Sequence, residues 1–145
     1  MIALDTNLLV YAHRLDLDWH GCALDIVRSC AEGKDSWAVP WPCLHEFLAV
    51  VTHRRIFKQP STLEQALRQA RAWLSSPTIV LLNETEGYFS VFERVLMESQ
   101  VSGAKIHDAR IAALCIAHGV SELWTADRDF SRFPGLRTRN PMVGK

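Results

Sequence analysis

Four carboxylates stand apart from the other acidic residues of the sequence. Asp5 ends an apolar run that begins at Ile2, and Asp127 follows a second apolar segment late in the chain. Glu46 and Asp108 lie within helical patterns of apolar residues. Clustered carboxylates repel one another and raise each other's pKa, so a protein tolerates them chiefly by binding cations. An all-oxygen ligand set suits Mg²⁺ or Mn²⁺ rather than zinc.

Each of these acids also has an ordinary structural explanation. Asp5 suits the N-cap of the helix after it, and Asp127 suits a turn. Asp108 would interact favourably with a helix macrodipole, which is worth about 0.3–1 kcal/mol. Glu46 either lies on the helix surface, where it can pair with a basic residue such as Arg54, or faces a buried site. In a buried site, a lone carboxylate costs several kcal/mol unless it is paired or bound to a metal ion.

Short strands alternate with helices along the whole sequence. This alternation predicts parallel pairing and an α/β/α sandwich around a central, mainly parallel sheet of four to five short strands. No repeat, low-complexity tract or linker interrupts it, so we expect one domain over residues 1–145. The strands are expected at 2–4, 37–40, 78–82, 122–125 and 136–138, and the helices around 8–12, 23–30, 42–51, 61–74, 84–100 and 104–118.

The predicted sheet gives the four acids a common location. Open α/β sheets bind ligands at the carboxyl ends of their strands, and Asp5 and Asp127 follow the first and fourth strands. Asp108 shares a helix face with Ala112, and the helix that carries Glu46 can converge on the same edge. One or two cations there would activate water and neutralise the charge of a phosphodiester.

Composition limits the class of protein. A chain of 145 residues can bury a core, and 48% hydrophobic and 22% charged residues are ordinary values for a globular protein. Its formal net charge of zero argues against holding nucleic acid by overall charge, although a local basic rim stays possible. We expect no membrane span and no secretory signal. The cysteines have no metal-type spacing, so we expect reduced core cysteines in a cytoplasmic protein: Cys22, Cys30, Cys43 and Cys115.

Five short motifs follow one another over nearly the whole chain. They are Leu4-Asp5-Thr6-Asn7, His45-Glu46-Phe47, the segments 106–113 (IHDARIAA) and 124–130 (WTADRDF), and Arg139-Asn140-Pro141. In this order and spacing they resemble the PIN-domain ribonucleases, specifically the VapC-type toxins of bacterial toxin–antitoxin pairs. The chain does not depart from that pattern at any of the four acids.

The resemblance implies a Mg²⁺-dependent endoribonuclease, with Mn²⁺ as a possible substitute, and it gives roles to individual residues. Asp5 and Asp108 would bind the metal directly. Glu46 and Asp127 would complete a second site or hold metal-bound waters. The accessory residues would be Thr6, Asn7 and Thr125, which orient the carboxylates by hydrogen bonds, and the further acid Asp129.

The resemblance also implies partners: an RNA substrate, a cognate antitoxin protein and a second copy of the chain in a homodimer, all in the cytoplasm. His107 borders Asp108, but a metal-activated water does not require it as a general base. Basic residues near the motifs are candidates for contacts to RNA phosphates, with surface salt bridges as the alternative: Arg14, Arg54, Arg55, Lys105, Arg110, Arg128 and Arg132.

Two other functions stay open at this point. A small-molecule phosphatase of the haloacid dehalogenase type also begins with a strand that ends in Asp. It needs a second Asp two residues later, where this chain has Asn7. A non-catalytic PIN-like binding module would be expected to have lost acids from the cluster, and this chain retains all four.

Overall fold

The computed structural model describes residues 1–143, which form one sheet with helices around it. The strands are β1 (Ile2–Leu4), β2 (Trp37–Pro40), β3 (Ile79–Leu82), β4 (Glu122–Trp124) and β5 (Thr138–Arg139). Their order across the sheet is β3-β2-β1-β4-β5, and every neighbouring pair is parallel. The α/β class and the sheet of four to five short parallel strands are therefore confirmed.

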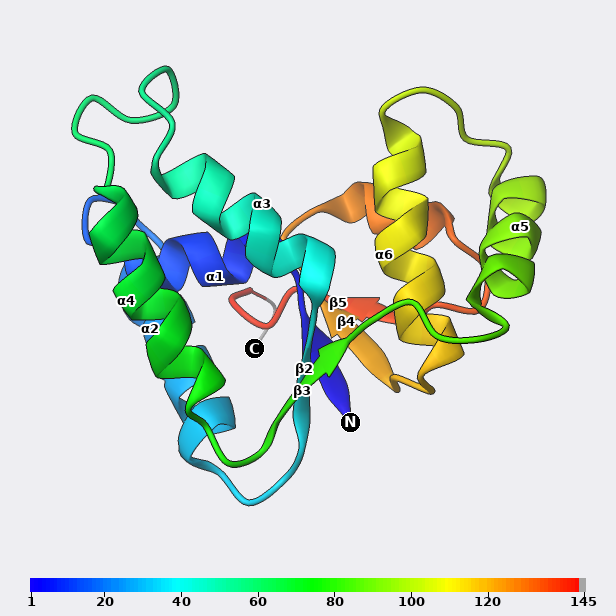
Figure 1. The fold of residues 1–145 in the computed structure, drawn as a ribbon, viewed down its shortest axis with the longest axis horizontal. Helices are drawn as coiled ribbons and strands as arrows, with labels where there is room; N and C mark the ends of the chain where they lie inside the picture. The colour runs from blue at the N-terminus through cyan, green and yellow to red at the C-terminus, as the bar shows by residue number, and fades with distance from the viewer. Residues whose placement is uncertain (144–145) are drawn as a thin grey trace.

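Helices lie on both sides of the sheet (Figure 1). The first group, α1, α2 and α4, lies to the left in this view, α5 and α6 lie to the right, and α3 continues upward from β2. The helices are α1 (Thr6–His13), α2 (His20–Glu32), α3 (Trp41–Val51), α4 (Leu63–Leu74), α5 (Tyr88–Ser99) and α6 (Lys105–Ala117), with a 3₁₀ helix η1 (Arg128–Arg132) after β4.

The central strand β1 determines where the acids meet. Ala3 and Leu4 are fully buried, with β2 on one side and β4 on the other. The backbone N–H of Asp5 donates to the carbonyl of Trp124 at 3.0 Å, which extends the pairing of β1 and β4 by one residue. The segments that follow these two strands therefore start side by side at the carboxyl edge of the sheet.

Some boundaries differ from those expected from the sequence. Helix α5 begins at Tyr88 instead of near residue 84, because Gly87 adopts a left-handed conformation with φ 86° and ends a turn there. Helix α4 begins at Leu63 instead of near residue 61, because Thr62 and Gln65 form a capping box at its start. The last strand covers 138–139 instead of 136–138.

The cysteines fit the prediction only in part. Cys43 and Cys115 are buried, Cys30 is half-buried, but Cys22 is exposed on α2 and is not a core residue. All four are free thiols. None of the helices within residues 1–143 is long and apolar enough to cross a membrane.

Phe47 joins the helices on the left of the sheet. Its ring is fully buried and makes edge contacts with His13 of α1 and Trp73 of α4, with centroids 5.3 and 4.8 Å apart. Phe47 therefore packs α1, α3 and α4 together, and Glu46 is the residue before it on α3.

We expect Phe47→Ala to lower the free energy of unfolding by about 3–5 kcal/mol, because it removes a buried ring and leaves a cavity. Phe89→Ala is the matched control, since Phe89 is 66% exposed on α5, and it should change the stability by no more than about 0.5 kcal/mol. Urea unfolding followed by circular dichroism measures both. Equal losses in the two variants would contradict this view of the core.

Candidate functional site

The carboxylate of Asp5 is buried at the carboxyl end of β1, with 4% of the residue exposed. It caps α1, since its Oδ1 accepts the backbone N–H of Thr6 at 2.8 Å. Oδ1 also accepts the thiol of Cys43 at 3.5 Å. Oδ2 accepts the hydroxyl of Thr125 at 2.7 Å and the side-chain amide of Asn7 at 3.2 Å. Four donors from three parts of the chain therefore hold this one side chain.

The same polar groups connect β1 to the segment after β4. The amide of Asn7 also donates to the Thr125 hydroxyl oxygen at 3.1 Å, and its carbonyl oxygen accepts the backbone N–H of Ala126 at 3.1 Å. The backbone N–H of Asp127 donates to the same Thr125 oxygen at 3.0 Å. These contacts fix Asp127 relative to Asp5.

Helix α3 is tied to the site by a further contact. The hydroxyl of Thr6 donates to Glu46 Oε2 at 3.2 Å. Thr6, Asn7 and Thr125 therefore all contact one of the predicted acids, as a set of side chains that orient carboxylates would.

All four predicted acids line one cavity of about 410 Å³. Asp5, Glu46, Asp108 and Asp127 reach it from β1, α3, α6 and the end of β4. Asp129 does not line this cavity. The rest of the lining is Thr6 and Asn7 together with an apolar wall of Val10, Tyr11, Leu17, Val50, Ile56, Phe57, Ile111 and Phe130.

Burial determines the electrostatics of the site. Desolvation raises the pKa of Asp5 to about 6, against the opposing hydrogen bonds from Thr125 and the Thr6 backbone, and the charge of Glu46 raises it further. Desolvation also raises the pKa of Asp108, where Lys105 acts in the opposite direction and Asp127 adds to the rise. A cation in the cavity would therefore stabilise the ionised forms of these carboxylates.

The donor set fits a hydrated divalent cation. Across residues 1–143, no three His, Cys, Asp or Glu side chains lie close enough together to hold a metal ion by themselves. Mg²⁺ characteristically binds through one or two carboxylates and keeps several waters. A cavity of about 410 Å³ has room for such an ion, because a water occupies about 30 Å³.

Lys105 forms salt bridges, which were the alternative to an RNA contact, and its partners are two of the predicted site acids. Its ammonium lies 2.5 Å from Asp129 Oδ2 and 3.5 Å from Asp108 Oδ2. The contact with Asp129 raises the pKa of Lys105 and lowers that of Asp129. The basic group next to the acids is therefore their counter-ion, and the predicted accessory acid Asp129 shares it with Asp108.

Arg14 forms a salt bridge, the alternative to an RNA contact, and it is not placed to contact RNA. It is buried and pairs with Asp16 through two hydrogen bonds of 2.8 and 2.6 Å. Its guanidinium also lies 4.0 Å from the ring centroid of Phe57, which belongs to the apolar wall of the acidic cavity. Arg14 therefore packs against Phe57 and stabilises the wall of the acidic cavity.

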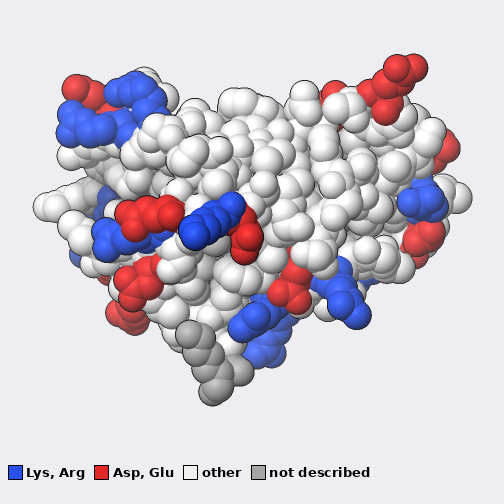
Figure 2. All heavy atoms as spheres, turned by 90° about the horizontal axis from the view of Figure 1, so that it is seen from below, with Lys and Arg blue, Asp and Glu red and all other residues white. Residues whose placement is uncertain are grey.

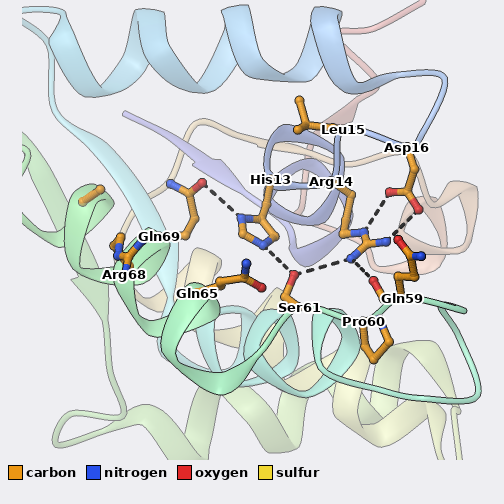
Figure 3. A pocket seen from close by; sticks show the side chains of 11 residues that line it. His13, Arg14, Leu15, Asp16, Gln59, Pro60, Ser61, Gln65, Arg68 and Gln69 are labelled. Atoms are coloured by element: carbon orange, nitrogen blue, oxygen red, sulfur yellow. Dashed lines mark hydrogen bonds and ion pairs between the residues drawn. The ribbon is translucent and has the colours of Figure 1, made fainter.

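Arg14 also lines a second cavity, of about 770 Å³ (Figure 3). His13 contacts Gln69 at 3.2 Å through Nδ1 and Ser61 at 2.9 Å through Nε2. Arg14 donates to the carbonyl of Gln59 at 2.9 Å and to the Ser61 hydroxyl at 3.5 Å. The dashed contacts in Figure 3 run from His13 and Arg14 to Ser61 and Gln59, so they hold the segment between α3 and α4 against α1 and the residue after it.

The face seen from below carries no large patch of one charge (Figure 2). Blue and red side chains are interspersed along its left half and lower edge, and most of its centre is white. This distribution agrees with the net charge of zero.

The chain is similar to known proteins over nearly its whole length. The family model of the PIN domain matches residues 2–136. The chain is 33% identical over 145 residues to "VapC ribonuclease Mb2897" of Mycobacterium bovis, covering 100% of this chain and 98% of the relative. It is 31% identical over 140 residues to "Ribonuclease VapC48" of Mycobacterium tuberculosis, covering 97% of each.

Solved structures share the fold at lower identity. VapBC2 from Rickettsia felis, bound to a DNA fragment from its promoter, superposes with a TM-score of 0.66 at 23% identity, covering 96% of this chain and 98% of that one. DNA-bound VapBC from Salmonella typhimurium gives a TM-score of 0.62 at 15% identity, covering 95% and 96%.

The raised pKa of Asp5 predicts a particular pH dependence of stability without metal. Between about pH 4 and pH 6 the unfolded chain releases this proton while the folded chain keeps it, so the stability falls as the pH rises. Asp5→Asn removes this contribution to the pH dependence, because the Asn side chain does not ionise. Relative to the variant, the wild type should lose up to about 3 kcal/mol between about pH 4 and pH 7, from 1.36 kcal/mol per pKa unit.

Urea unfolding in EDTA over a pH series measures this difference, whatever constant offset the substitution adds. Asp18→Asn is the matched control, because Asp18 is exposed between α1 and α2. Parallel profiles for the wild type and Asp5→Asn would show that the Asp5 carboxyl is not desolvated.

The support behind the cavity gives another prediction. Arg14→Met should lower the free energy of unfolding by about 1–3 kcal/mol, since it removes hydrogen bonds from a charged donor. It should also speed amide hydrogen exchange in residues 53–61. Arg68→Met, at an exposed ion pair with Glu64, should cost less than about 1 kcal/mol. Unchanged exchange in residues 53–61 of Arg14→Met would contradict the proposed support.

Proposed function

This chain belongs to the PIN-domain family, and on that premise we propose that its acidic cavity is the active site of an endoribonuclease toxin of a toxin–antitoxin pair. The observation that carries the proposal is the convergence of Asp5, Glu46, Asp108 and Asp127 on one cavity. The full-length relatives named VapC ribonuclease supply the reaction class, hydrolysis of RNA. The chain is accordingly a hydrolase.

The cofactor of the proposed reaction is Mg²⁺, with Mn²⁺ as a substitute. Asp5 and Asp108 would bind the ion directly, and Glu46 and Asp127 would bind through waters or complete a second site. When bound, the ion supplies an activated water and neutralises charge on the phosphodiester. Oxygen ligands of this kind are those that both ions prefer.

The side chains around the acids contribute orientation. The hydroxyl of Thr125 and the amide of Asn7 hold Asp5 Oδ2, and the hydroxyl of Thr6 holds Glu46. Because these donors come from fixed elements, the carboxylates are held in place before substrate arrives. Preorganised ligands of this kind cost no rearrangement at the moment of reaction.

An apolar wall that includes Phe57 lines part of the cavity. Electrostatic interactions next to such a wall are stronger than they would be in bulk water.

The proposal extends to partners and location. A cognate antitoxin is supported by the two VapBC structures that share the fold. A homodimer and a cytoplasmic location, where the RNA substrate would be found, complete the proposal.

The two alternative functions receive less support from the site. At the position where a phosphatase of the haloacid dehalogenase type needs a second Asp, Asn7 makes hydrogen bonds to Asp5, Thr125 and Ala126. An amide cannot act there as a general acid. A non-catalytic module gives no reason to keep four carboxylates on one cavity.

We expect Asp5→Asn and Asp108→Asn each to lower the rate of RNA hydrolysis in Mg²⁺ by at least about 100-fold, the scale on which loss of a group that stabilises the transition state acts. Both variants should retain the wild-type circular dichroism spectrum. Mapping of 5′ ends in cellular RNA after brief expression of the wild type and of each variant measures the activity.

Chelation of the metal by EDTA should abolish wild-type cleavage, and Mg²⁺ or Mn²⁺ should restore it. Cleavage by both variants at the wild-type rate would overturn the assignment of the acids. Hydrolysis of a small phosphate ester without any cleavage of RNA would favour the phosphatase.

A further inference from the structure

A third cavity, of about 420 Å³, adjoins the acidic cavity. Its polar lining is His45 and Glu46 from α3 and His107, Asp108 and Arg110 from α6. Glu46 and Asp108 also line the acidic cavity. The two cavities therefore share these carboxylates as a common border, and a ligand in one lies next to the chemistry in the other.

The side chains of this third cavity offer hydrogen-bond donors. A guanidinium carries five N–H donors, and Glu84 accepts from Nε of Arg110 at 2.7 Å. Within residues 1–143 the Arg110 side chain makes no other hydrogen bond and is 39% exposed, so its terminal N–H groups are left to donate to a ligand. His107 is exposed one residue before Asp108, and within residues 1–143 its ring nitrogens make no hydrogen bond.

One aromatic surface lies beside these donors. The ring of His45 packs 5.9 Å from that of Trp41 at an angle of 31°, and His45 is exposed on the first turns of α3. Flat rings of this kind stack with the unpaired bases of single-stranded RNA.

The two adjoining cavities differ in polarity. Apart from its acids, Thr6 and Asn7, the acidic cavity is lined by apolar residues such as Val50, Ile56 and Phe57. The third cavity adds the basic side chains of Arg110 and His107. A charged phosphate backbone avoids the apolar wall because its desolvation there would go uncompensated. A strand that crosses the acids therefore continues towards the third cavity.

We propose that this third cavity binds the nucleotide next to the scissile phosphate of a single-stranded RNA. Arg110 and His107 donate to its phosphate, and His45, backed by Trp41, stacks on its base. A volume of about 420 Å³ lies within the range of small-ligand pockets, about 300–1,000 Å³. This assignment rests on the proposed ribonuclease function and adds the residues that set the path of the substrate.

The experiment measures the affinity for a labelled single-stranded RNA of random sequence in EDTA, over a series of salt concentrations. His45→Ala should weaken binding at least about fivefold, the lower end of what one base stack contributes. His107→Ala and Arg110→Gln should weaken it by at least a similar factor, because each removes a hydrogen bond to a charged phosphate. Arg110→Gln should also reduce the slope of log Kd against log salt by about 0.7, the value of one phosphate contact on a single strand.

Two controls separate RNA contact from structural support. Glu84→Gln breaks the ion pair with Arg110 but leaves the guanidinium, so it should bind RNA at least as tightly as the wild type. His118→Ala, beyond the opposite end of α6, should bind within twofold of the wild type, a margin of about 0.4 kcal/mol. In Mg²⁺, the three cavity variants should raise KM for RNA cleavage more than they lower kcat.

Failure of the subsite can be distinguished from failure of the ribonuclease function. If the wild type neither binds nor cleaves RNA, the ribonuclease function fails, and the subsite fails with it. If the wild type binds and cleaves RNA but the three variants match His118→Ala, only the subsite is overturned. Weakened binding by Glu84→Gln equal to that of Arg110→Gln would show that the pair acts structurally, and would also overturn the subsite.

Discussion

The buried carboxylate of Asp5 is the group on which the geometry of the site depends. Removing a charge from water costs several kcal/mol unless hydrogen bonds compensate it. Here the compensation comes from the Thr6 backbone, Asn7, Cys43 and Thr125. These donors belong to α1, α3 and the segment after β4, so satisfying one carboxylate requires all three to meet at the end of β1. The hydrogen bonds that satisfy Asp5 therefore also hold together the three segments that form the site.

The same four donors affect how a cation would bind. An ionised carboxylate offers about four lone-pair sites, and Asp5 already accepts four hydrogen bonds. Direct ligation by Asp5 therefore has to replace one of them, and the longest are those from Cys43 at 3.5 Å and Asn7 at 3.2 Å. Asn7 lines the cavity, so its amide is the donor that a bound cation would displace. Since burial raises the pKa of Asp5 to about 6, cation binding below that pH would also release a proton.

Much of this arrangement could be predicted from the sequence because it depends on local patterns. The run Ile2–Leu4 before Asp5 indicated a strand, and alternation with helices indicated parallel pairing, which brings the ends of β1 and β4 together. The contacts that adjust the acids could not be predicted in this way. Lys105 meets Asp129 across 24 residues, and the Cys43 thiol meets Asp5 across 38. The sequence does not distinguish Arg14 from a surface base, but the structure buries it beside Phe57.

The zero net charge constrains how such a site can hold RNA. Long-range attraction is weak for a chain with 16 basic and 16 acidic residues, so affinity has to come from groups close to the acids. Two of these are already paired: Lys105 with Asp108 and Asp129, and Arg110 with Glu84. Solvent-exposed ion pairs are worth only about 0–1 kcal/mol, so a phosphate can replace a carboxylate partner at little cost. The pairs hold the basic side chains beside the acids, where an RNA phosphate would meet them.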